Sequence, residues 1–251
     1  MALVIFGDVV GSRRDSTGSS AWLRDLVAEL NDAYATHKLA DFGFTQGDEV
    51  QGLLAAEADP LVAVLHAALA GAARPIRWVC VWGVVDPAPH NDPATQHTGT
   101  AFLKARAVIE EARIGHDRLV ILTGRADADA LLGGMTPALM DLLDDLTPTQ
   151  RVVARLAMID GLRQSEVAER LNVRRATISV SFARAKITSL QRLVDAIRLV
   201  CRNDWPPPDS AESAEPAPAE TTPARTLEGV DDAEWLTASA NRQIEDRGRN
   251  R

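Results

Sequence analysis

The stretch Leu3-Val4-Ile5-Phe6-Gly7-Asp8-Val9-Val10-Gly11-Ser12-Arg13 contains the pattern that decides the fold of the N-terminal part. Four large apolar residues in succession predict a short buried strand over residues 3–6. An acid and two glycines follow, where such a strand would end. A second acid, Asp48, lies in the segment Gln46-Gly47-Asp48-Glu49, between two more apolar stretches. Because Gly and Asp favour turns, we expect Asp48 at the tip of a hairpin.

Six predicted elements alternate in the order strand, helix, strand, strand, helix, strand. They cover residues 3–6, 21–37, 41–45, 50–54, 61–72 and 76–85. This order is typical of an α+β, ferredoxin-like βαββαβ domain, also called a palm domain. In that topology the first strand lies between the third and fourth and pairs antiparallel with the third. The topology therefore predicts that Asp8 and Asp48 lie side by side at one end of the sheet.

The rest of the chain is predicted to be mostly helical. A helix is expected from Gly99 to Arg113, a strand over 119–122 and a short helix over 126–132. Gly133-Gly134 predicts a break, and a connecting helix follows from Thr136-Pro137. We therefore expect a palm-like domain at 1–134, a connecting helix at 135–146, an all-α helix-turn-helix domain at 147–202 and a disordered tail at 203–251. The tail is acidic and rich in Pro and Ala, so it would bury too little apolar surface to fold.

Charge is distributed unevenly along the chain. The net charge of −8 argues against a protein that binds nucleic acid over its whole surface. Residues 147–202, however, hold eleven Lys and Arg against four Asp and Glu, whereas residues 204–251 hold five against eleven. Contact with a polyanion is therefore expected in 147–202 alone.

Several classes of protein are disfavoured by composition. The two cysteines, Cys80 and Cys201, match no metal-ligand spacing, and Cys80 lies in an apolar run typical of a buried thiol. We find no signal-peptide pattern, and the longest apolar stretch, 61–73, is too short to cross a bilayer. We expect a cytoplasmic protein with no membrane partner.

Residues 164–186 predict a helix-turn-helix. The motif needs a small residue where the helices touch, a turn residue that tolerates positive φ and an apolar anchor on the second helix. Ala168, Asn172 and Ile178 supply these three, at spacings of four and six. The core side is expected to consist of Val167, Leu171 and Val173.

The second helix is expected to begin at Arg174 or Arg175, to run past Lys186 and to bind double-stranded DNA. Arginine and small hydroxyl side chains suit base edges and phosphates in the major groove. The predicted DNA-binding residues are Arg174, Arg175, Thr177, Ser179, Ser181, Arg184 and Lys186. The segment 146–185 resembles the DNA-reading region of sigma factors and LuxR-type regulators, which implies a DNA-reading role.

The acids of the N-terminal part suggest a second kind of site. Two carboxylates fixed at strand ends suit a divalent cation that carries a nucleotide phosphate, and neighbouring glycines let phosphate reach backbone N–H groups. The segments around Asp8 and Asp48, the strand 76–83 and the segment from Thr98 to Arg106 resemble the bacterial SatD family. The same motifs resemble class III nucleotidyl cyclases and diguanylate cyclases.

This resemblance implies a nucleotide-binding site. Asp8 and Asp48 would bind Mg²⁺ or Mn²⁺, and the backbone of Val9–Gly11 would meet the phosphates of a purine nucleotide. With the neighbouring residues that suit phosphate, the candidate nucleotide-binding set is Gly7, Val9, Val10, Gly11, Ser12, Arg13, Gly47, Lys104 and Arg106.

Three functional hypotheses are consistent with this sequence. The first is a DNA-binding transcription regulator whose palm-like domain senses a nucleotide or a divalent metal. The second is a nucleotidyl cyclase with Asp8 and Asp48 as catalytic residues; Phe44 and Leu103, however, stand where cyclases carry Lys and Asn. The third is a non-catalytic dimerisation scaffold. Because helix-turn-helix proteins and cyclase palms commonly pair, we expect a homodimer.

Overall fold

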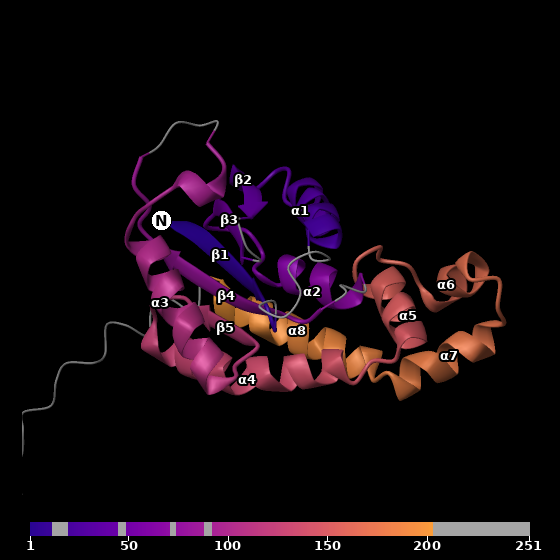
Figure 1. Ribbon diagram of the computed structural model, residues 1–251. Helices are drawn as coiled ribbons and strands as arrows, with labels where there is room; N and C mark the ends of the chain where they lie inside the picture. The colour runs from indigo at the N-terminus through magenta and orange to yellow at the C-terminus, as the bar shows by residue number, and fades with distance from the viewer. Residues whose placement is uncertain (12–19, 45–48, 71–73, 88–91, 203–251) are drawn as a thin grey trace, which may run out of the picture. The chain divides into compact units, whose positions relative to one another are not determined.

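A five-stranded sheet forms the centre of the N-terminal part in the computed structural model (Figure 1). The structure describes residues 1–11, 20–44, 49–70, 74–87 and 92–202. The strands are β1 (Ala2–Val9), β2 (Lys38–Phe44), β3 (Glu49–Ala55), β4 (Ile76–Gly83) and β5 (Leu119–Leu122). Their spatial order is β2-β3-β1-β4-β5. The first strand lies between the third and fourth, as predicted, and it pairs antiparallel with both. β5 adds to β4 in parallel.

Strand β1 is buried on both faces of this sheet. Leu3 and Ile5 belong to the core formed with α1 (Ser20–Ala33) and α2 (Leu61–Leu69). Val4 and Phe6 belong to a second core beneath α3 (Thr100–Gly115). Helices on both faces leave no solvent-facing side, which explains why the strand reads as a continuous apolar run rather than an alternating one.

Glycines let aromatic rings lie directly on the strands. A Cβ built on Gly7 would lie 2.6 Å from the ring of Trp78, and one on Gly52 would lie 2.1 Å from the ring of Phe42. Both separations are well below van der Waals contact, so neither position accepts a side chain without displacing the ring. Gly7 was predicted to belong to a nucleotide site, but the structure shows it packed against Trp78.

One long helix, α4 (Ala126–Asp144), occupies the region where a break was predicted. The prediction of a break at Gly133-Gly134 is therefore wrong, and the predicted domain boundary at residue 134 falls inside a helix. Leu132, Thr136 and Leu139 form a buried stripe along it, followed by Met140 and Leu143. Packing of this stripe outweighs the poor helix propensity of two glycines and of Pro137.

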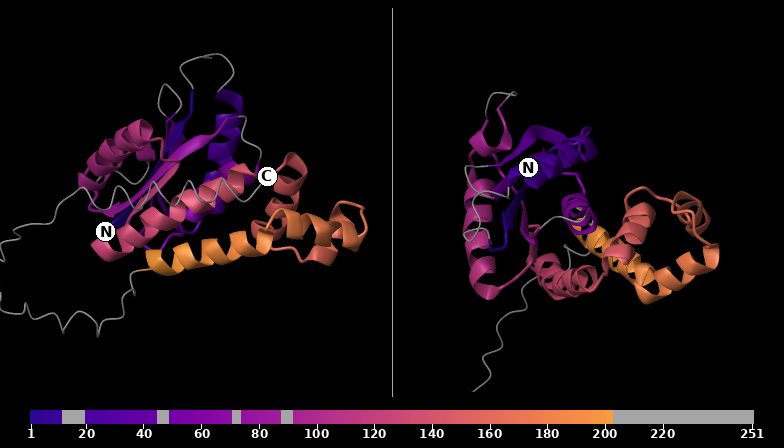
Figure 2. Two further views of the ribbon diagram at one scale, coloured as in Figure 1. Left: turned by 90° about the horizontal axis from the view of Figure 1, so that it is seen from below. Right: turned by 45° about the vertical axis from the view of Figure 1, so that its right-hand side comes forward.

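Four further helices follow: α5 (Pro148–Met158), α6 (Gln164–Arg170), α7 (Arg175–Arg184) and α8 (Ile187–Cys201). Helix α8 returns to the sheet part and packs along α4 (Figure 1 and Figure 2). Arg125 Nη2 donates to the carbonyl of Val200 at 2.6 Å, and Arg198 Nε donates to Asp59 Oδ2 at 2.7 Å. The last helix of segment 147–202 is therefore one of the elements that pack this segment against the sheet part.

The helices of the described residues are all too short or too polar to cross a membrane. The predicted disorder of the tail concerns residues 203–251, which lie outside the described part of the chain.

Candidate functional site

The helix-turn-helix begins with a well-formed cap on α5. Thr147 Oγ1 accepts from the Gln150 amide, and the Gln150 side chain accepts from the Thr147 amide. This reciprocal capping box satisfies two N–H groups that the first turn would otherwise leave without partners, and Pro148 occupies the first helical position. The sequence Thr-Pro-Thr-Gln thus fixes where α5 starts.

The three key residues of the motif have the predicted roles. Ala168 is buried on α6, Asn172 has φ +50° in the turn, and Ile178 is only 2% exposed on α7. Val167 is buried and Leu171 packs against the core, as expected. Val173 was predicted to face the core, but it is 42% exposed. Its amide bonds to the carbonyl of Ala168, so the turn is closed by backbone while the side chain points outward.

Most side chains of helix α7 are exposed, although Ser181 and Phe182 are half-buried. Ile178 is the one buried residue of this helix. Of the predicted DNA-binding residues, six are exposed: Arg174, Arg175, Thr177, Ser179, Arg184 and Lys186. Ser181 is half-buried, on the side of Ile178 and Ala185. An α-helix held by so little of its surface can enter a groove as wide as the major groove of DNA.

The second helix is shorter than predicted. We expected it to run past Lys186, but α7 ends at Arg184 and Lys186 has φ +51° before α8 begins. Ala185 and Ile187 are both buried, on either side of the exposed Lys186. Burying both neighbours requires a change of direction between them, and this tertiary requirement explains the left-handed residue.

A cluster of alternating charges lies at the end of the sheet, on its α3 side. Asp8 on β1 lies opposite Arg77 on β4 and opposite Glu49 on β3. Asp8 Oδ2 accepts from Arg77 Nη1 at 3.0 Å, and Glu49 Oε1 accepts from Arg106 Nη2 at 2.9 Å. The guanidinium carbon of Arg106 also lies 5.3 Å from the centre of the Phe6 ring, a cation–π contact. The cluster therefore contains two acids and two arginines.

Two members of this cluster, Glu49 and Arg77, were not among the predicted site residues, and no signal at all in the sequence pointed to Arg77. The Arg77 side chain is 6% exposed, and its Nε donates to the carbonyl of Asp117. Arginine inside an apolar strand reads as a surface residue unless the register with Asp8 is known. Only strand pairing places the two side chains opposite each other.

The other candidate nucleotide-binding residues are in different situations. The Val10 amide already donates to the carbonyl of Pro75 at 2.9 Å. Gly11 is exposed with φ +77°, and its carbonyl accepts from Arg74 Nη1 at 3.1 Å. Val9 pairs with Ile76 in the sheet, and Lys104 is exposed on α3. The remaining four lie outside the described residues: Ser12, Arg13, Gly47 and Asp48.

The described residues do not by themselves make a metal centre. Within the described ranges, no three His, Cys, Asp or Glu side chains gather closely enough to hold an ion. Asp8 and Glu49 lie opposite each other, but each carboxylate bonds an arginine. A divalent cation there would compete with two guanidinium groups, so the described donor set fits a metal poorly without Asp48.

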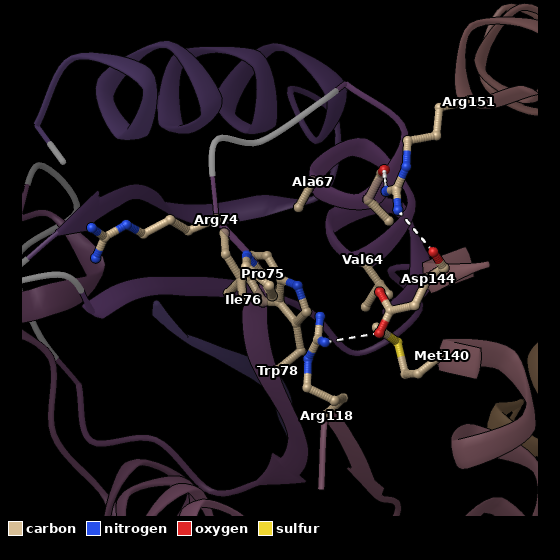
Figure 3. Close-up of a pocket in the computed structure, with 11 residues that line it drawn as sticks. Val64, Ala67, Arg74, Pro75, Ile76, Trp78, Arg118, Met140, Asp144 and Arg151 are labelled. Carbon is tan, nitrogen blue, oxygen red and sulfur yellow. Dashed lines mark hydrogen bonds and ion pairs between the residues drawn. The ribbon is translucent and has the colours of Figure 1, made fainter. Parts of the chain in front are cut away.

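A hollow of about 170 Å³ lies among α2, the start of β4 and α4, and Arg151 of α5 also lines it (Figure 3). Asp144 joins two arginines beside it: its Oδ2 accepts from Arg118 Nη1 at 2.9 Å, and its carbonyl accepts from Arg151 Nη2 at 3.3 Å. Arg151 Nη1 also donates to the carbonyl of Ala68 at 2.6 Å. Arg74 lines the same hollow, but its side chain extends away from this pair (Figure 3). Arg151 thus links the first turns of α5 to the end of α2.

Both thiols are buried and unpaired with each other. Burial raises the pKa of Cys80 well above its ordinary value and that of Cys201 to about 12. Neutral thiols are poor nucleophiles and poor metal ligands. The two cysteines therefore act as small apolar core residues, as the sequence predicted for Cys80.

Comparison with known protein families identifies one region of similarity. The family model described as sigma-70, region 4 matches residues 137–188, which run from the second half of α4 through α7. The match supports a sigma-factor-like helix-turn-helix in the C-terminal part and a role like that of a DNA-binding transcription regulator. A search of curated proteins found no match.

Proposed function

We propose that the chain is a transcription regulator that binds double-stranded DNA through α6 and α7 of segment 147–202. The observation that carries this proposal is the exposure of α7: Ile178 alone is buried, and arginines lie at both ends of the helix. The sigma-70 region 4 match over the same helices supports it. In this arrangement α6 supports α7, and α7 enters the major groove.

The experiment compares two double variants in the full chain. Arg174→Ala with Arg175→Ala removes two exposed cations at the start of α7. Arg24→Ala with Arg113→Ala removes two exposed cations from the sheet part and serves as the matched control. Affinity for duplexes selected from a random-sequence library is measured by fluorescence anisotropy at several salt concentrations.

We expect the α7 variant to bind at least tenfold more weakly than the wild-type protein. Its salt dependence should fall by about one unit of log–log slope for each DNA phosphate that the variant no longer neutralises. The control should bind like the wild-type protein. Equal binding by both variants would contradict the assignment of α7 as the recognition helix.

The finer proposal is that the N-terminal part is a ferredoxin-like palm that senses a nucleotide and biases the DNA reader. The strand order and the helices on both faces support the palm assignment, and the motifs around Asp8 support the likeness to the SatD family. Arg106 is 57% exposed beside Glu49, which gives a phosphate an accessible cation. Asp8 and Asp48 remain the proposed ligands of Mg²⁺ or Mn²⁺.

A thermal-shift experiment with ATP or GTP, with and without Mg²⁺ or Mn²⁺, tests this finer proposal. Helix α3 offers a matched pair of variants, Arg106→Ala and Arg113→Ala, because both arginines are exposed and each bonds a glutamate. We expect nucleotide to raise the Tm of the wild type and of Arg113→Ala but not of Arg106→Ala. Asp48→Ala should remove the metal dependence.

The same samples distinguish the remaining alternatives. A nucleotide product that Asp48→Ala abolishes would favour a nucleotidyl cyclase. The absence of both a product and a thermal shift would favour a dimerisation scaffold. Sedimentation equilibrium with and without DNA tests the proposed homodimer, which matches the two-fold symmetry common among helix-turn-helix proteins. We also propose that the protein acts in the cytoplasm, where its DNA would be found.

A further inference from the structure

The outermost ridge of α7 is apolar. Successive residues of an α-helix are rotated by about 100°, so Ala176 and Val180 each lie about 160° from the buried Ile178, and Ala183 lies about 140° from it. All three are exposed, and Val180 is 50% exposed. These residues, spaced i, i+4 and i+7, form what we call the α7 ridge.

Polar residues flank the α7 ridge on both sides. Arg175 and Ser179 lie between the ridge and the core on one side, and Thr177 and Arg184 on the other, each between about 60° and 120° from Ile178. All four are exposed. If Ile178 faces the rest of the helix-turn-helix, the flanks face the walls of a groove, and the ridge faces its floor.

The floor of the major groove offers one apolar group. That group is the 5-methyl of thymine, or of 5-methylcytosine; the other base edges present hydrogen-bond donors and acceptors. A polar side chain at the tip of the helix would read those donors and acceptors, whereas Val180 cannot. The two alanines add no bulk that would hold the helix away from the bases.

We propose that the α7 ridge, with Val180 at its centre, recognises the 5-methyl group of a pyrimidine in the major groove. This inference rests on the proposed DNA-binding function and assigns a specificity to it. The flanking arginines and hydroxyls supply phosphate and base-edge contacts, and Val180 selects for the methyl group by burying it. Val173 is exposed too, at 42%, but it precedes α7 and is not part of this ridge.

The test begins with duplexes selected by the full-length wild-type protein from a random-sequence library. Each thymine of a selected duplex is replaced in turn by deoxyuridine, which lacks the methyl group and keeps the same hydrogen-bonding edge. Burial of one methyl group corresponds to an affinity change of about fourfold. We therefore expect about a fourfold loss at one or two thymines and no loss at the others.

Val180→Ala isolates the protein partner of that methyl group. Alanine is a better helix former than valine, so the substitution should leave α7 folded. We expect Val180→Ala to bind thymine and deoxyuridine duplexes within twofold of each other. Val84→Ala, which truncates a 61%-exposed valine beyond the end of β4, should keep the wild-type preference.

A further arm distinguishes thymine from 5-methylcytosine. At each sensitive position the T·A pair is replaced by C·G and by 5-methyl-C·G. Recovery of affinity with 5-methyl-C over C shows that the methyl group itself is recognised, whichever pyrimidine carries it; no recovery shows that recognition is restricted to thymine.

Two outcomes would overturn the inference, and they differ in meaning. In the first, the wild type binds selected duplexes tightly, but deoxyuridine does not lower its affinity, or lowers the affinity of Val180→Ala by the same factor. Methyl recognition by Val180 is then wrong, and DNA binding stands. In the second, no duplex is bound above the level of random DNA; the proposed function then fails and the inference fails with it.

Discussion

Asp8 illustrates how one side chain can serve stability and a candidate site together. Its carboxylate is 26% exposed and bonds Arg77, whose side chain is 6% exposed. A guanidinium buried to that degree requires an acceptor, because an unpaired buried charge is costly. Asp8 therefore has a structural role whatever ligand the sheet end binds.

We expect Asp8→Ala to lower the free energy of unfolding by about 2 kcal/mol, since it leaves Arg77 without its carboxylate. Urea denaturation measures the change. Asp41→Ala is the matched control, because Asp41 is 65% exposed and bonds Lys38 at 2.7 Å. The control should differ from the wild type by no more than about 0.5 kcal/mol. Equal stability of the two variants would show that Asp8 does not hold Arg77 in solution.

The helices show where local propensity and tertiary packing disagree. A pair of glycines and a proline predict an interrupted segment, yet α4 continues through all three. Its buried stripe spans the predicted break, so a break would expose apolar side chains on one side of it. Burying those side chains is worth more than the propensity that the glycines lack.

Two glycine substitutions test this account at the level of the element. Gly134→Ala places a Cβ on the exposed side of a helix, with no atom within 4 Å, and should raise the free energy of unfolding by about 0.5–1 kcal/mol. Gly161→Ala meets no atom either, but φ there is +69°, so the free energy should fall by about 1 kcal/mol. Destabilisation by Gly134→Ala would favour the interrupted helix that the sequence alone predicts.

At the scale of the whole molecule, ion pairs connect the sheet part to the helices that follow it. Glu29 on α1 accepts from His66 Nδ1 on α2 at 2.9 Å and from Arg155 Nη2 on α5 at 2.7 Å. Arg198 on α8 reaches Asp59, just before α2. Together with the bond from Arg151 to Ala68, these contacts hold α5 and α8 against the sheet part, and none of them involves α7.

A double-mutant cycle between Glu29 and Arg155 measures this connection. Because both side chains are about one-third exposed, we expect Glu29→Ala and Arg155→Ala to be coupled by about 0.5–1 kcal/mol in urea unfolding. The cycle for Arg163 and Glu166, neighbours on the exposed start of α6, is the comparison and should give a smaller coupling, because solvent screens that pair more strongly. Zero coupling for the first cycle would mean that this ion pair does not help to hold α5 against α1 in solution.

The sequence by itself determined the features that depend on neighbours along the chain. The order of the first six elements, the capping of α5 by Thr147 and the roles of Ala168, Asn172 and Ile178 all follow from local pattern, because periodicity and turn chemistry act over a few residues. For the same reason the sequence identified α7 as the candidate DNA-binding helix.

Tertiary structure alone decided what depends on residues far apart in the chain. Strand register placed Arg77 and Glu49 on either side of Asp8, and packing carried α4 through its glycines. The same packing turned the chain at Lys186, so that α8 returns to the sheet part. In α4 and at Lys186, the local preference of the residues amounts to a fraction of a kcal/mol to about 1 kcal/mol per residue. Burial of many apolar groups at once contributes more than this, so packing prevails over the local preference.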